Sequence, residues 1–117
     1  MEIDLDPLER KVADLLSRWC AQQDRCVSKA QEKCRQRGLE GPQVDKVVDW
    51  LISRRFLDDE RFAQSYARGK FRQKRWGEIK IRHHLRSLRV ENHAIDRAIQ
   101  KELKKSDVLQ SLDDLIA

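Results

Sequence analysis

Apolar side chains recur every three or four residues along most of the chain, which is the period of amphipathic α-helices. Stripes of this kind predict helices over about residues 7–22, 28–37, 43–55, 59–75, 78–88 and 92–103. A last amphipathic segment after Ser106 carries Val108, Leu112, Leu115 and Ile116. The pattern therefore predicts an all-α protein.

Several predicted helix ends carry residues that suit them. Ser28, followed three residues later by Gln31, forms the pattern of a capping box at the start of the second helix. Gly38 can adopt the left-handed conformation that commonly ends a helix. Asp58 and Asn92 are the predicted N-caps of the fourth and sixth helices, because their side-chain oxygens can accept hydrogen bonds from free backbone amides.

The chain resembles itself when it is shifted by 51 residues. This shift aligns Cys34 with Leu85 and residues 44–48 with residues 95–99 without a gap. Three short helices bury one small core, and successive cores would join end to end into an elongated, curved body of tandem three-helix repeats. The predicted divisions are an N-terminal helix over residues 7–26, a first three-helix repeat over 27–75, and a second over 76–117 that the end of the chain truncates.

Positive charge is concentrated in one part of the sequence, although the net charge of the chain is only +5. Between residues 61 and 89, Glu78 is the one acidic residue. This basic segment contains Arg61, Arg68, Lys70, Arg72, Lys74, Arg75, Lys80, Arg82, Arg86 and Arg89. A solvated helix face usually mixes both signs of charge. The near-absence of acids favours a contact surface for a nucleic acid or another polyanion over a solvated face.

The helical period divides the basic segment into two arginine rows. Arg61, Arg68, Arg72 and Arg75 line one face of the fourth predicted helix, and Arg82, Arg86 and Arg89 line the fifth. The opposite faces carry the predicted buried stripe of Phe62, Ala63, Tyr66, Ala67, Phe71, Ile81, Leu85 and Leu88. The aromatic residues of this stripe could stack on bases, but their spacing favours the core. Trp76, beside Gly77 between the two helices, is expected to pack or to form a hinge.

Composition limits the class of protein and its chemistry. No apolar run approaches the length of a membrane span, and the first ten residues lack the features of a signal peptide, so a cytoplasmic protein is expected. Cys20, Cys26 and Cys34 contain no C-x-x-C pair. Reduced thiols on helices are therefore favoured over a zinc site, which would require a fourth ligand. No cofactor or metal is expected.

Catalysis has little support in the sequence. Asp58, Asp59 and Glu60 could be imagined as magnesium ligands, but adjacent residues on a helix point about 100° apart. No second carboxylate cluster follows at a matching spacing, and no phosphate-binding glycine loop or nucleophile motif is present. Roles in capping and in complementing the helix dipole explain these acids, so we expect a protein that is not an enzyme.

The sequence resembles the RecX family of regulators of the RecA recombinase. The resemblance covers about residues 10–100, and its most specific part is the Leu-Asp-Asp-Glu-Arg-Phe-Ala segment at residues 57–63. A Trp-Gly pair and an Ile-Arg-His-His-Leu helix follow, and an Arg-x-x-Ser pattern begins at Arg25. The residues expected to serve this motif structurally are Leu57, Asp58, Asp59, Phe62, Ala63, Trp76, Gly77, Ile81 and Leu85.

The resemblance implies a function as well as a fold. RecX-like proteins are tandem three-helix repeats that bind along the groove of the RecA–DNA filament and restrain its strand-exchange and co-protease activities. We therefore expect a monomeric regulator that contacts the filament and its DNA through the ten basic residues and does not associate with membranes. The alternative is a helical module that binds DNA or RNA without sequence preference, as phosphate contacts alone would allow.

Overall fold

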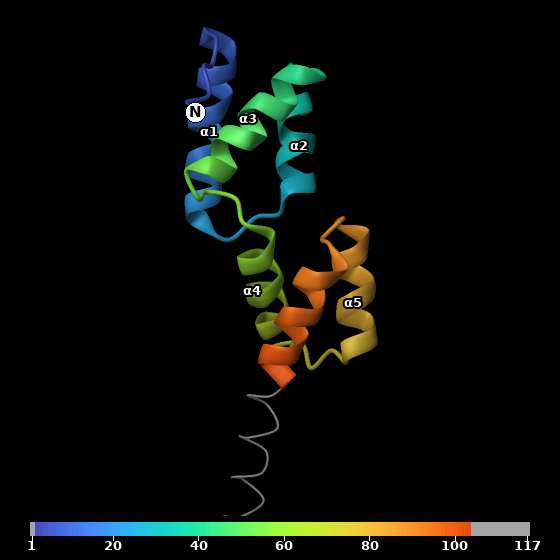
Figure 1. The fold of residues 1–117 in the computed structure, drawn as a ribbon. Coiled ribbons are helices and arrows are strands. Elements are labelled where there is room, and N and C mark those ends of the chain that lie inside the picture. The colour runs from blue at the N-terminus through green and yellow to red at the C-terminus, as the bar shows by residue number, and fades with distance from the viewer. Residues whose placement is uncertain (1, 104–117) are drawn as a thin grey trace, which may run out of the picture. The chain divides into compact units, whose positions relative to one another are not determined.

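The computed structural model describes residues 2–103, which are helical apart from short connections and contain no strand (Figure 1). The predicted all-α class is confirmed. The five labelled helices are α1 (Pro7–Gln22), α2 (Val27–Gln36), α3 (Pro42–Ser53), α4 (Asp59–Arg72) and α5 (Glu78–Ser87). A further helical stretch covers residues 92–103. The predicted segment with Val108, Leu112, Leu115 and Ile116 lies outside the described residues.

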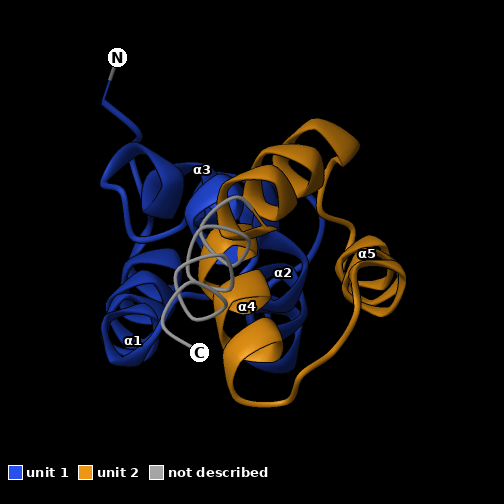
Figure 2. Ribbon diagram, turned by 90° about the horizontal axis from the view of Figure 1, so that it is seen from below, with its two compact units in different colours: residues 1–62 blue, residues 63–117 orange. Residues whose placement is uncertain are grey.

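The chain forms two compact units, residues 1–62 and residues 63–117, which Figure 2 shows in different colours. The first unit contains α1, α2 and α3. Its core includes Val12 and Leu16 of α1, Cys34 of α2 and Leu51 of α3, all of which are buried. Leu57 joins this core from the connection that leads to α4. The apolar stripe of α1 thus becomes buried against the two helices that follow it.

The second unit is built from most of α4, α5 and the helical stretch 92–103. The helix α4 contributes only the small buried residues Ala63 and Ala67. The larger side chains come from the other two helices, where Ile81, Leu85 and Ile95 are each 0% exposed. Phe62, Tyr66 and Phe71, which the sequence placed in the buried stripe, are only partly buried.

The observed units differ from the predicted divisions after residues 26 and 75. The predicted first repeat combined α2, α3 and α4 and left α1 apart. In the structure α1 packs with α2 and α3, because Val12 and Leu16 need apolar partners and find them there. The grouping is therefore α1–α2–α3 in one unit and α4–α5–(92–103) in the other, with the division at residue 62 inside the first turn of α4.

The 51-residue repeat is reproduced in the backbone hydrogen bonds of the two units. The amide of Leu39 donates to the carbonyl of Cys34 at 3.1 Å, and the amide of Val90 donates to the carbonyl of Leu85, also at 3.1 Å. These bonds close the ends of α2 and α5 at positions 51 residues apart, and all four residues are buried. Each unit therefore contains the same helix–turn–helix hydrogen-bonding pattern.

Two helix starts differ from their predictions. The helix α2 begins at Val27, one residue before Ser28, and its N-cap position is occupied by Cys26, whose side chain makes no capping bond. Asn92 is itself helical, and its side-chain oxygen accepts a hydrogen bond from Arg86. A capping box is instead present at α1, where the Asp6 side chain and the Glu9 side chain each accept a hydrogen bond from the other's backbone amide.

Candidate functional site

The segment 57–63 fixes the connection between helices. Asp58 caps α4, as predicted, because its Oδ1 accepts hydrogen bonds from the amides of Glu60 and Arg61 at 3.0 and 3.1 Å. Asp59 caps a different helix: its Oδ1 accepts a bond from the amide of Val27 at 2.9 Å, at the start of α2. The buried Leu57 anchors the segment in the core of the first unit. Both aspartates thus serve helix ends.

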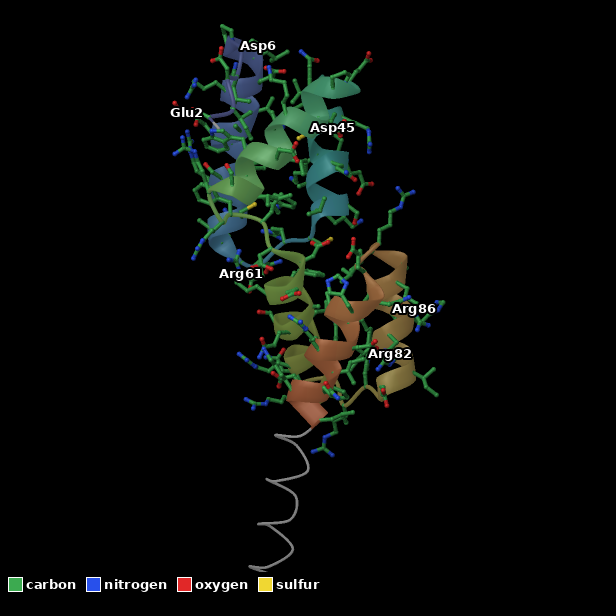
Figure 3. All side chains as sticks on the ribbon, viewed as in Figure 1. Glu2, Asp6, Asp45, Arg61, Arg82 and Arg86 are labelled. Atoms are coloured by element: carbon green, nitrogen blue, oxygen red, sulfur yellow. The ribbon has the colours of Figure 1, made fainter. Side chains whose placement is uncertain are left out.

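Arg61 is partly exposed, but its guanidinium is bonded within the protein. Its Nε donates to Asp24 Oδ1 at 2.7 Å, which joins α4 to the connection between α1 and α2. Its two terminal nitrogens donate to the carbonyls of Arg55 and Phe56 at 3.1 and 3.3 Å. Figure 3 labels this side chain beside the beginning of α4. The guanidinium therefore holds together two loops of the first unit.

Three other arginines of the predicted rows are also engaged within the second unit. Arg68 donates to Glu102, whose side chain is only 2% exposed, at 3.3 Å. Arg82 pairs with both Glu78 and Asp96, and the hydrogen bond to Asp96 is the main cause of its raised pKa. Arg86 donates to the side chain of Asn92 at 3.3 Å. Figure 3 shows Arg82 and Arg86 on α5.

The remaining basic residues have no carboxylate partner among the described residues. Arg72, at the end of α4, and the following Lys74 and Arg75 are exposed, and their side chains make no hydrogen bond or ion pair within residues 2–103. Arg89, just beyond α5, is exposed in the same way. Exposed cations without partners retain their full capacity to bind anions. The structure thus divides the predicted set into engaged arginines and available cations.

Trp76 packs between α4 and α5, and two lysine side chains lie over its ring. Its ring lies 6.5 Å from that of Tyr66 and 4.7 Å from that of His84, centroid to centroid. The Nζ atoms of Lys70 and Lys80 lie 4.7 and 4.3 Å from the ring centroid, within the range of cation–π attraction. Trp76 is partly buried. It therefore links the two helices and fixes two lysines of the basic segment.

Ile79 is a surface residue that the helical pattern did not single out. Its side chain is 85% exposed in the first turn of α5. It borders a shallow depression lined also by Gly77, Glu78, Lys80 and His83. Ile79 is two residues from Ile81, whereas residues on one face of a helix are three or four apart. This spacing could have indicated from the sequence that Ile79 is exposed. The depression is open, and one of its lining residues, Lys80, also lies beside the ring of Trp76.

The groups considered for metal binding do not gather within residues 2–103. No group of three or more histidine, cysteine, aspartate or glutamate side chains in this range could hold a metal ion. Cys20, Cys26 and Cys34 are buried, and none forms a disulfide. Burial raises the pKa of the Cys34 thiol to about 11 and also raises the pKa of Cys20. The thiols of Cys20 and Cys34 are therefore protonated at neutral pH.

No helix within residues 2–103 combines the length and the apolar character needed to cross a membrane.

Comparison with known proteins finds a family model and a solved structure that are similar to this chain. Residues 58–99, from the N-cap of α4 into the last helical stretch, match the family model described as RecX, second three-helix domain. The chain also resembles the crystal structure of regulatory protein RecX, with a TM-score of 0.75 and 23% sequence identity. That similarity covers 80% of this chain but 46% of the other, so the chain spans about half the length of that protein. No curated protein matches the sequence.

The two similarities confirm the predicted resemblance to RecX and the predicted class of all-α three-helix repeats, but not the predicted bounds of the repeats. The structural similarity supports the fold alone, while the family match identifies the second unit in particular. The match begins at Asp58, so it assigns the whole of α4 to the second three-helix domain.

Proposed function

We propose that this chain, whose residues 58–99 match the RecX family model, is a member of that family, binds the RecA–DNA filament and lowers its recombinase and co-protease activities. The family match carries the proposal. It is supported by the location of the available cations, since Arg72, Lys74, Arg75 and Arg89 all lie in the matched segment. We further propose that the protein acts by binding, without a catalytic step, and that it does so as a cytoplasmic monomer.

The contact surface in this proposal is narrower than the ten residues predicted from the sequence. Arg61, Arg68 and Arg82 already have carboxylate partners, so a filament contact would have to compete with existing ion pairs. Binding of phosphate by the available cations, or by the two lysines beside Trp76, would not require an existing ion pair to be broken. We assign the main contacts with phosphate to Lys70, Arg72, Lys74, Arg75, Lys80 and Arg89.

The test is a filament-inhibition assay with the recombinase from the same source. Strand exchange and co-protease cleavage are measured while the protein is titrated, and its occupancy of free DNA is measured in parallel. We expect inhibition at protein concentrations well below those that coat the DNA. Competitor DNA added in excess should then leave most of the inhibition in place.

A second candidate function is a module that binds DNA or RNA without sequence preference. The charge of the basic segment favours it, because ten basic residues against one acid attract any polyanion. In that case inhibition would follow DNA occupancy and would disappear when competitor DNA is added. That outcome would contradict the proposed regulatory function and support a general nucleic-acid-binding module.

A further inference from the structure

Three arginines adopt the left-handed backbone conformation, which is unfavourable for residues that carry a Cβ atom. They are Arg55 with φ 63°, Arg75 with φ 55° and Arg89 with φ 61°. Each follows the end of a helix, where glycine is the usual residue. Two of the three, Arg75 and Arg89, lie in the basic segment. The turn at Arg89 can be compared with the equivalent turn in the first unit.

That reference is Gly38, which lies 51 residues earlier at the end of α2. Gly38 also has a positive φ, 95°, and its amide donates to the carbonyl of Arg35. In the second unit the amide of Arg89 donates to the carbonyl of Arg86. The two turns thus share one hydrogen-bond pattern, and one of them uses glycine. The turn itself therefore does not require an arginine at position 89.

The side chain of Arg89 has no compensating contact in the described part of the protein. It is exposed and makes no hydrogen bond, ion pair or ring contact there, whereas Arg86, three residues earlier, is bonded to Asn92. A strained backbone without an internal compensation is typical of a residue kept for function. Within residues 2–103, the remaining source of stabilisation for Arg89 is the attraction between its charge and the C-terminal end of α5.

We propose that Arg89 contacts a phosphate group of bound nucleic acid, and that this contact is obtained at the expense of fold stability. The proposal rests on the proposed function. A planar guanidinium matches two phosphate oxygens, and Arg89 lies two residues beyond the end of α5. A polyanion fits this surface better than a single carboxylate, because further available cations follow α4 in the same unit.

The test compares the full-length protein with Arg89→Gly and with the matched control Arg55→Gly. Thermal unfolding is followed by circular dichroism. Binding to a fluorescein-labelled single-stranded oligonucleotide is measured at several salt concentrations, without recombinase. For Arg89→Gly we expect a melting temperature higher by about 4–8 °C, and a slope of log affinity against log salt reduced by about 0.7. Arg55→Gly should raise the melting temperature similarly and leave the slope unchanged.

The reciprocal variant Gly38→Arg completes the design. It should lower the melting temperature, since φ 95° is unfavourable for any residue with a Cβ atom, and it should leave the salt slope unchanged. An unchanged slope in Arg89→Gly overturns the proposal. So does an unchanged or lower melting temperature, which would show that Arg89 stabilises the fold through the helix dipole. Equal slope losses in Arg89→Gly and Arg55→Gly would show only a general effect of charge.

The oligonucleotide-binding test of Arg89 and the filament-inhibition assay can fail independently of each other. If the wild-type protein does not bind the oligonucleotide even at low salt, the phosphate contact is overturned. Inhibition of the filament could then still be observed, because it could proceed through contacts with the recombinase alone. Conversely, a confirmed contact at Arg89 together with inhibition that merely follows DNA occupancy would support the inference and reject the regulator.

Discussion

Arg61 has the charge of a ligand-binding residue and the contacts of a structural one. Its guanidinium bonds to Asp24 and to the carbonyls of Arg55 and Phe56, so it satisfies acceptors on two loops at once. A lysine could not reproduce this, because the fork of an arginine presents several donors in fixed directions.

Replacing Arg61 by alanine should therefore reduce stability and leave nucleic-acid binding unchanged. The side chain is 43% exposed, which limits the expected loss to about 1 kcal/mol. Urea unfolding of Arg61→Ala, Asp24→Asn and the double variant measures the coupling between the two residues. Independent effects of the two substitutions, or a loss of oligonucleotide affinity in Arg61→Ala, would contradict this role.

The burial of Cys34 predicts how the stability of the protein depends on pH. Burial raises the pKa of its thiol to about 11, whereas an unfolded thiol ionises near 9. The contribution to stability is therefore complete below pH 9 and is lost as the pH rises from 9 through 11. Urea midpoints at pH 8 and pH 10.5 should differ more for the wild type than for Cys34→Ala. A thiol reagent should label Cys34 at neutral pH only after unfolding, and fast labelling of the native protein would show that the site is open.

At the scale of elements, α2 begins with help from a residue 32 positions later. Its N-cap residue Cys26 makes no capping bond, and the amide of Val27 donates to Asp59 instead. The start of α2 is thus stabilised only once α4 has begun in place. The hydrogen bond that caps α2 thus comes from a residue distant in the sequence and not from the N-cap residue itself.

Removing this cap should be measurable. Asp59→Ala should lower the free energy of unfolding by about 1 kcal/mol, as loss of a helix cap usually does. Asp59→Asn keeps a side-chain oxygen and should lose less. Chemical denaturation of both variants makes the comparison. If the two losses were equal, the charge of Asp59 near the start of α4 would matter and its hydrogen bond to Val27 would not.

Which elements were predictable follows from the range of the interactions that define them. Helical stripes are local, so all six predicted helices have counterparts in the described residues, and the start of α1 at Pro7 was confirmed. The cap of α2 depends on Asp59, which no local pattern contains. The pairing of Arg68 with the buried Glu102 likewise joins residues 34 positions apart. A row of arginines in a sequence therefore cannot show which of its members are already engaged.

At the scale of the whole molecule, the two units differ in charge. Residues 1–62 contain 12 basic and 13 acidic residues, which gives −1, whereas residues 63–117 contain 13 and 7, which gives +6. The two values add up to the net charge of +5. The attraction for a polyanion therefore belongs to the second unit, and salt should weaken binding through that unit.

Reversing two available cations tests this distribution. Arg72→Glu with Arg75→Glu should preserve the helical content and reduce the salt slope of oligonucleotide binding by about 1.4, or two phosphate contacts. The control Arg10→Glu with Arg18→Glu makes the same change of charge on α1 and should alter the slope little. Equal effects of the two double variants would mean that only net charge matters. Arg68→Glu is unsuitable as a probe, because it would place an acid beside the buried Glu102.

The aromatic contacts of the two units bear on how related repeats are recognised. In the first unit Arg25 lies 4.6 Å from the ring of Trp19, and in the second Lys70 lies 4.7 Å from the ring of Trp76. A shift of 51 residues places Trp19 on Lys70 and Arg25 on Trp76, so the ring and the cation have exchanged positions while their attraction persists. Scored one position at a time, this contact counts as two mismatches. Scored as a pair, it counts as a preserved interaction, and it extends the 51-residue correspondence back to the first helix.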